Sequence, residues 1–128
     1  MNEASISLGK LLLNVLKLAF VNMVHKVIVQ KRAYTQFQSI CDYLVETFGE
    51  SVADAFEFEV ENCVATLKKF PESGHPEPIQ SKYLYRSKIV GTHNKMYYFV
   101  DRNTLVIAAF ADMRMHPDNV IKAVIGKM

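Results

Sequence analysis

The chain has 128 residues, of which 50% are hydrophobic, and its formal net charge is +2. This length predicts one domain, and the hydrophobic share is enough to form a core at that size. The longest apolar stretch, residues 11–21, contains Asn14 and Lys17. It therefore excludes a membrane span, which needs about 20 apolar residues.

Residues 1–22 differ in pattern from the rest, and we treat them as an N-terminal extension of a domain at residues 23–128. Lys10, Asn14 and Lys17 recur at helical spacing and leave apolar side chains on the opposite side. One interpretation is an amphipathic helix packed on the domain or on a partner. The other, which we favour, is that the natural chain starts at Met23.

The charges are distributed unevenly along the chain. Residues 42–77 carry nine acidic and two basic side chains, whereas residues 82–128 carry eight basic and three acidic ones. The simplest interpretation is two solvated faces of opposite sign. The alternative is a basic working surface for a nucleic acid or an acidic protein.

The two cysteines, Cys41 and Cys63, match no metal-binding spacing such as C-x-x-C. Both lie in helical patterns, so we expect reduced thiols that pack as small hydrophobic groups in a reducing compartment. The histidines are dispersed in the sequence, and no carboxylate–histidine cluster joins them. We therefore expect neither a metal nor a cofactor.

In chain order, residues 24–29 alternate as a strand does. From Arg32 the period is that of a helix, which ends at Gly49, and a second helix follows at once and ends at Pro71. Residues 71–78, PESGHPEP, predict a turn-rich connector. Residues 119–125 predict a short final helix.

Residues 85–114 predict three strands joined by two tight turns, the second of them at Arg102-Asn103. Side chains alternate along each strand, so one side is apolar and is assigned to the core. That side contains Ile89, Met96, Tyr98, Val100, Leu105, Ile107 and Ala109.

The set of residues on the other side of this meander depends on the position of the first turn, which we place at residues 91–94. It then carries the cations and aromatic residues Arg86, Lys88, Lys95, Tyr97, Phe99 and Phe110, with Arg114 at the same parity. Such a surface suits an anionic partner. A shift of one residue in the pairing would move each side chain to the opposite face.

These elements predict a two-layer α+β domain, with the order strand, helix, helix and three-stranded antiparallel meander. The helical hairpin packs on the core side of a small antiparallel sheet. The first strand is expected at the edge of the sheet or beside the last strand.

The order of these elements resembles the RelE/ParE superfamily, the toxins of bacterial type II toxin–antitoxin pairs. The resemblance covers residues 23 to about 124. It depends on VHKVIV, ICDYLVETFGE, LKKFPESGHPEP, YRSKIV and KMYYFVDRNTLVIAAFADMRMHP, in that order. The Leu-x-x-x-Pro-x-x-Gly connector and the Arg-x-x-Pro ending are more similar to the ParE side.

The resemblance implies a cytoplasmic, RelE/ParE-like protein that a cognate antitoxin binds and neutralises as a hetero-oligomer, with no role for a membrane. ParE-type members inhibit DNA gyrase, and RelE-type members cut mRNA on the ribosome. We expect the first activity, with the ribonuclease as the alternative. A degenerate toxin that acts only as a binding partner is the third possibility.

For the ribonuclease alternative, the resemblance implies basic residues on the sheet as the catalytic group. Arg86, Lys95 and Arg114 would stabilise charge on the phosphate, and Lys88 would be the base. RelE-like enzymes usually add a late Tyr or His, but the equivalent place here falls near Val120; His116 is the available substitute. Tyr97, Phe99 and Phe110 are expected to bind an apolar segment of the antitoxin.

Overall fold

The computed structural model describes residue 24 and residues 26–126 of the chain. The two interpretations of residues 1–22 lie outside this range. The elements follow one another as β1 (Lys26–Val29), α3 (Lys31–Phe48), α4 (Glu50–Lys69), β2 (His75–Pro76), β3 (Arg86–Val90), β4 (Asn94–Asp101), β5 (Thr104–Asp112) and α5 (Pro117–Ile125). None of the described helices is long and apolar enough to cross a membrane.

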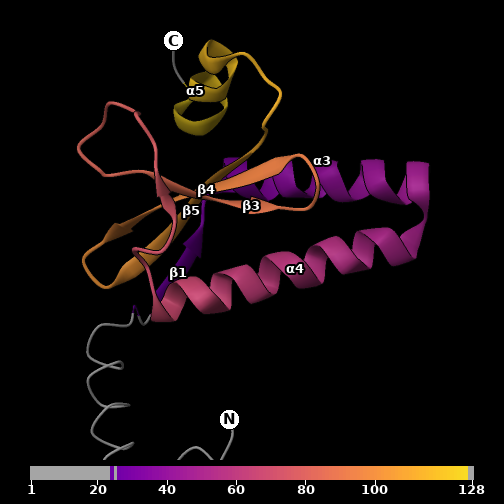
Figure 1. Ribbon diagram of the computed structural model, residues 1–128, viewed down its shortest axis with the longest axis horizontal. Coiled ribbons are helices and arrows are strands. Elements are labelled where there is room, and N and C mark those ends of the chain that lie inside the picture. The colour runs from indigo at the N-terminus through magenta and orange to yellow at the C-terminus, as the bar shows by residue number, and fades with distance from the viewer. Residues whose placement is uncertain (1–23, 25, 127–128) are drawn as a thin grey trace, which may run out of the picture.

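The architecture confirms the predicted α+β class and the predicted order of elements (Figure 1). The strands form one sheet in the order β1-β5-β4-β3-β2, in which β1 runs parallel to β5 and the other pairs are antiparallel. The first strand therefore lies at the edge beside the last one, as expected. The short strand β2, within the connector, was not predicted.

The helices α3 and α4 form a hairpin that covers one face of the sheet (Figure 1). Gly49 joins them at φ 100°, a value that side-chain-bearing residues rarely adopt, and its N–H donates to the carbonyls of Leu44 and Val45. The apolar stripes of both helices meet the sheet. The buried residues of this core are Val24, Ala33, Phe56, Val60, Leu67, Val90, Met96, Tyr98, Leu105, Ile107 and Phe110.

The opposite face of the sheet is also covered, by α5 and the segment that leads into β3 (Figure 1). Three small residues of β5, Ala108, Ala109 and Ala111, face this side and leave room for α5 to pack closely. The other buried residues of this second core are Tyr85, Tyr97, Phe99, Val106 and Val124. A sheet buried on both faces explains why residues 105–111 are apolar without alternation.

The predicted turn between β4 and β5 is confirmed. Asp101 pairs with Thr104 around a two-residue loop, and Tyr98 pairs with Ile107 as expected. An irregularity between Tyr97 and Tyr98 then shifts the register, so that Met96 pairs with Phe110 instead of Ala109. This bulge turns Phe110 into the core under the helices, and the prediction that it lies on the opposite side is wrong.

The predicted turn between β3 and β4 is wrong by one residue. The loop contains three residues, 91–93, because Val90 pairs with Asn94. Gly91 adopts φ 66°, which suits a tight turn. Consequently Val90 is buried under the helices, whereas Ile89 is 62% exposed. Arg86 and Lys88 share the side of Val90, away from Lys95.

Candidate functional site

The four cations of the expected catalytic group do not share one surface. Arg86 and Lys88 point to the side of the sheet that α3 and α4 cover, and Lys95 points to the side of α5. Arg114 follows β5 at the other end of the meander. The strand positions of Arg86 and Asp112 are four residues apart along β4, which is roughly 13 Å. The common basic face predicted from the sequence is therefore wrong.

Arg86 holds the connector between α4 and β3. Its guanidinium donates to the carbonyl oxygens of Glu72, at 3.1 Å, and Gly74, at 3.0 Å. The hydroxyl of Tyr98 donates to the carbonyl of Pro71, at 2.7 Å, and accepts from the N–H of Gly74, at 3.0 Å. The two bonds of Arg86 give it a structural role, and the two bonds of Tyr98 hold the same connector.

The same contacts explain the Leu-x-x-x-Pro-x-x-Gly spacing of the connector. Leu67 is completely buried in the core, and Pro71 follows one turn later, just past the end of α4. Gly74 lies so close to the hydroxyl of Tyr98 that a Cβ at this position would overlap it. Each residue of the motif therefore has a packing reason within the connector.

Lys95 belongs to a polar cluster on the α5 side of the sheet. Its ammonium forms an ion pair with Glu77, at 2.9 Å, and the same carboxylate oxygen accepts from the hydroxyl of Ser87, at 2.6 Å. Burial, with the nearby Glu77 carboxylate, raises the pKa of Tyr97 to about 12. The cluster joins the connector to the sheet and leaves Lys95 with little freedom to contact a phosphate.

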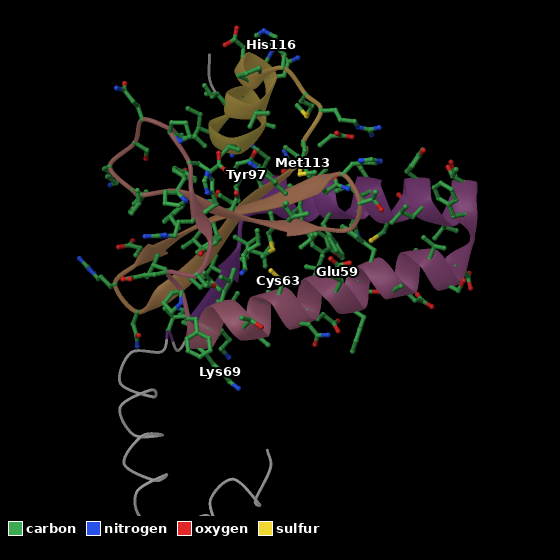
Figure 2. The ribbon with its side chains drawn as sticks, viewed as in Figure 1. Glu59, Cys63, Lys69, Tyr97, Met113 and His116 are labelled. Carbon is green, nitrogen blue, oxygen red and sulfur yellow. The ribbon has the colours of Figure 1, made fainter. Side chains whose placement is uncertain are left out.

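Lys88 of β3 lies near α4, and its charge acts on the thiol of Cys63, which Figure 2 shows on the sheet side of that helix. Burial raises the pKa of that thiol, and the ammonium of Lys88 partly offsets this effect. Neighbouring cations would help a lysine to act as a base. Arg86 lies two residues away on the same side of β3, but its guanidinium is bonded to the connector, and Lys95 lies on the opposite side of the sheet.

Arg114 is the most exposed of these four cations, and it is bound by its own neighbour. Both oxygens of the Asp112 carboxylate accept from its guanidinium, at 2.9 and 2.7 Å, and Oδ1 also accepts from its backbone N–H. These bonds hold the pKa of Asp112 well below its usual range. The pair is bidentate and exposed to solvent.

The three aromatic residues expected to bind a partner are buried. Tyr97 is 3% exposed, and Phe99 and Phe110 are each 5% exposed. Figure 2 shows Tyr97 between the sheet and α5. Phe110 packs against Phe37 of α3, with ring centroids 5.5 Å apart. The expectation that these residues form an open surface is therefore wrong.

A groove that the sequence did not predict lies between the helical hairpin and the β3–β4 turn. Both helices extend past that turn (Figure 1), and the space between has a volume of about 910 Å³. Its apolar lining includes three well-exposed side chains: Tyr43 is 59% exposed, Phe48 60% and Val52 41%. Phe48 and Val52 continue the helical periodicity of the apolar residues of α3 and α4, but the sheet ends before it reaches them.

The polar rim of this groove comes from the sheet end. Arg114 and its partner Asp112 lie there with His93, and Glu59 of α4 accepts from the N–H of Gly91 at 3.0 Å (Figure 2). Within residues 24 and 26–126, no three His, Cys, Asp or Glu side chains gather as metal ligands would. The groove has an apolar floor and a charged rim, and exposed apolar patches with polar rims are typical of binding sites.

No protein-family model matches the sequence, and no curated protein matches it. Among solved structures, the fold is similar to a chain described as belonging to the chromosomal ParDE TA system from P. aeruginosa, with a TM-score of 0.59. The two sequences are 14% identical, and the similarity covers 71% of this chain and 98% of the other. The similarity shows that the chain has the fold of a component of a toxin–antitoxin system.

Proposed function

We propose that this chain is the toxin of a type II toxin–antitoxin module. The observation that carries the proposal is the shared fold, which includes nearly the whole of a chain from a ParDE system. The helical hairpin, the meander and the clamped connector are the parts on which the sequence resemblance depends. Fold similarity supports a function by analogy, so the activity needs its own test.

We further propose that the toxin acts by binding its target, DNA gyrase, without cutting RNA. Cleavage needs cations that converge on one phosphate. Here Arg86 holds the connector, Lys95 is paired with Glu77, and Lys88 lies beside α4. This arrangement favours a binding protein over the ribonuclease alternative.

The antitoxin partner is proposed to bind in the groove between the helical hairpin and the β3–β4 turn. Exposed aromatic side chains such as Tyr43 and Phe48 are unfavourable in water, and a partner that covers them gains apolar contact. An amphipathic helix would place its apolar side on this floor. Its acidic residues would meet Arg114 at the rim.

The first experiment is a search beside the gene for a short open reading frame that encodes an acidic, helix-forming protein, followed by expression of the chain with and without it. We expect growth arrest with the chain alone and recovery when both are expressed. Growth that is unaffected by the chain alone would contradict the toxin proposal.

The second experiment separates the two targets. The purified chain is added to a gyrase supercoiling assay and to a translating extract in which mRNA integrity is followed. We expect supercoiling to be inhibited while mRNA remains intact. Rapid loss of mRNA would establish the ribonuclease instead, provided that Lys88→Ala and Arg114→Ala abolish the loss. The exposed control variant Lys122→Ala should still cause it.

A further inference from the structure

A second cavity, of about 330 Å³, lies on the α5 side of the molecule. It is an open depression bordered by the segment before β3, which forms a loop beside the sheet (Figure 1), by the end of α5 and by the start of α3. None of its lining residues belongs to the groove or to the Lys95–Glu77 cluster. The proposed function leaves this cavity without a role.

Aromatic rings form one wall of this cavity. The ring of Tyr83 stacks on Phe99, with centroids 4.1 Å apart and planes 11° from parallel. Tyr85 meets Phe99 edge-on, at 5.2 Å. Phe99 and Tyr85 are only 5% and 6% exposed, so the partly exposed ring of Tyr83 is the one available to stack on a nucleobase.

Donors of hydrogen bonds lie around the same space. Arg32 uses Nη1 to donate to the carbonyl of Val124, at 3.2 Å, which leaves its other N–H groups available. Ser81 Oγ accepts from the N–H of Tyr83, at 3.2 Å, and its hydroxyl also lies within hydrogen-bond reach of the Tyr85 hydroxyl. The ammonium of Lys82 lies over the Tyr83 ring, 5.2 Å from the centroid.

The charge of the cavity is positive. Within residues 24 and 26–126, no carboxylate forms an ion pair with Arg32 or Lys82. Asp101 is the nearby acid, and it accepts from the hydroxyl of Tyr83 at 3.4 Å without lining the space. Two cations and a hydroxyl beside an aromatic wall suit a ligand with both a phosphate and a flat ring.

We propose that this cavity binds a single nucleotide, with its phosphate on Arg32, Ser81 and Lys82 and its base against Tyr83. The carboxamides of Gln30 and Gln80 also line the space and can hydrogen-bond to the edge of a base. The volume is at the lower end for ligand pockets, which run from about 300 to 1,000 Å³, and so suits one nucleotide. The proposal does not depend on the toxin proposal.

The test is isothermal titration calorimetry of the full-length chain. The ligands are AMP, CMP, adenosine, inorganic phosphate and a short single-stranded RNA. We expect a nucleotide to bind at least about tenfold more tightly than adenosine or inorganic phosphate, because each of these lacks half of the contacts. Tighter binding of the RNA through the same residues would identify a strand end as the source of the nucleotide. If the RNA binds no more tightly than the mononucleotide, the ligand is a free nucleotide.

The variants Lys82→Gln and Tyr83→Leu test the two halves of the site; Lys82 is exposed, whereas Tyr83 is partly buried and stacks on Phe99 of the second core. We expect each to weaken nucleotide binding about tenfold. Lys82→Gln should leave the melting temperature nearly unchanged, and Tyr83→Leu, which also loses its contact with Phe99, is measured below its own melting temperature. Lys69→Gln, an exposed lysine at the end of α4 (Figure 2), is the matched control and should bind normally. Equal binding by all variants, or equal affinity for inorganic phosphate and nucleotide, would overturn the proposal.

Discussion

At the scale of single residues, the connector between α4 and β3 depends on the hydroxyl of Tyr98. That oxygen satisfies both the carbonyl of Pro71 and the N–H of Gly74. Tyr98 is completely buried, so no water replaces these bonds if the oxygen is removed. The residue thus contributes to the fold through its polar end as well as through its ring.

Tyr98→Phe is expected to lower the free energy of unfolding by about 1–3 kcal/mol, because it leaves two buried backbone groups without partners. Urea unfolding measures the change. Tyr43→Phe is the matched control, since its side chain is 59% exposed and is expected to change stability by less than about 0.5 kcal/mol. Equal losses in the two variants would show that the connector bonds contribute nothing.

At the scale of elements, α5 covers the second face of the sheet and makes it a buried, apolar face. Val124 of α5 is 1% exposed and packs with Tyr97 and Phe99 in the second core. The helix starts at Pro117, and the side chain of His116 accepts from the N–H of Asp118 as an N-cap. Its other end is held by Arg32, which donates to the carbonyl of Val124.

Val124→Ala is expected to destabilise the protein by roughly 1–3 kcal/mol, because it removes buried methyl groups and leaves a small cavity between α5 and the sheet. Thermal unfolding provides the measurement. Lys122→Ala, on the exposed side of the same helix, should have little effect. If the two variants unfolded at the same temperature, α5 would not be packed on the sheet in solution.

At the scale of the whole molecule, the lengths of the layers do not match. The 20 residues of α4 span about 30 Å, whereas the five residues of β3, which α4 contacts, span about 17 Å, so the tip of the helical hairpin extends past this part of the sheet (Figure 1). The apolar stripe of a helix normally faces a core. Here its outer part forms the floor of the groove that we assign to the antitoxin.

Phe48→Ser is expected to weaken the complex with the antitoxin at least about tenfold, because it removes an aromatic contact from the groove. Stability of the free chain should change little, since Phe48 is 60% exposed. Phe58→Ser is the matched control: Phe58 is 63% exposed on α4 but does not line the groove. Co-purification of the two proteins at increasing salt measures the difference, and equal retention of both variants would place the antitoxin elsewhere.

The helices and the β4–β5 hairpin were predictable because their determinants are local. The apolar residues of each helix recur with the helical period, and Gly49 marks the junction between them. A two-residue loop at Arg102-Asn103 leaves a single way to pair the adjoining residues. The α+β class and the order of elements followed from these patterns.

The facing of the cations was not predictable, because it depends on two one-residue features. The three-residue loop after Val90 sets which side of the sheet the β3 residues share with β4, and the bulge opposite Tyr97 and Tyr98 reverses the side of the β5 residues that follow Ala108. Hydrophobic alternation normally reveals such a reversal. It could not do so here, since α5 buries the second face and makes both sides of β5 apolar.

Local patterning in the chain thus specified which segments are helices and strands and the order in which they follow, because period and turn chemistry are properties of neighbouring residues. The groove, the separated cations and the nucleotide-sized cavity arise from contacts between residues far apart in the chain. Their positions depend on loop length, register and the relative lengths of packed layers, which no short stretch of sequence records.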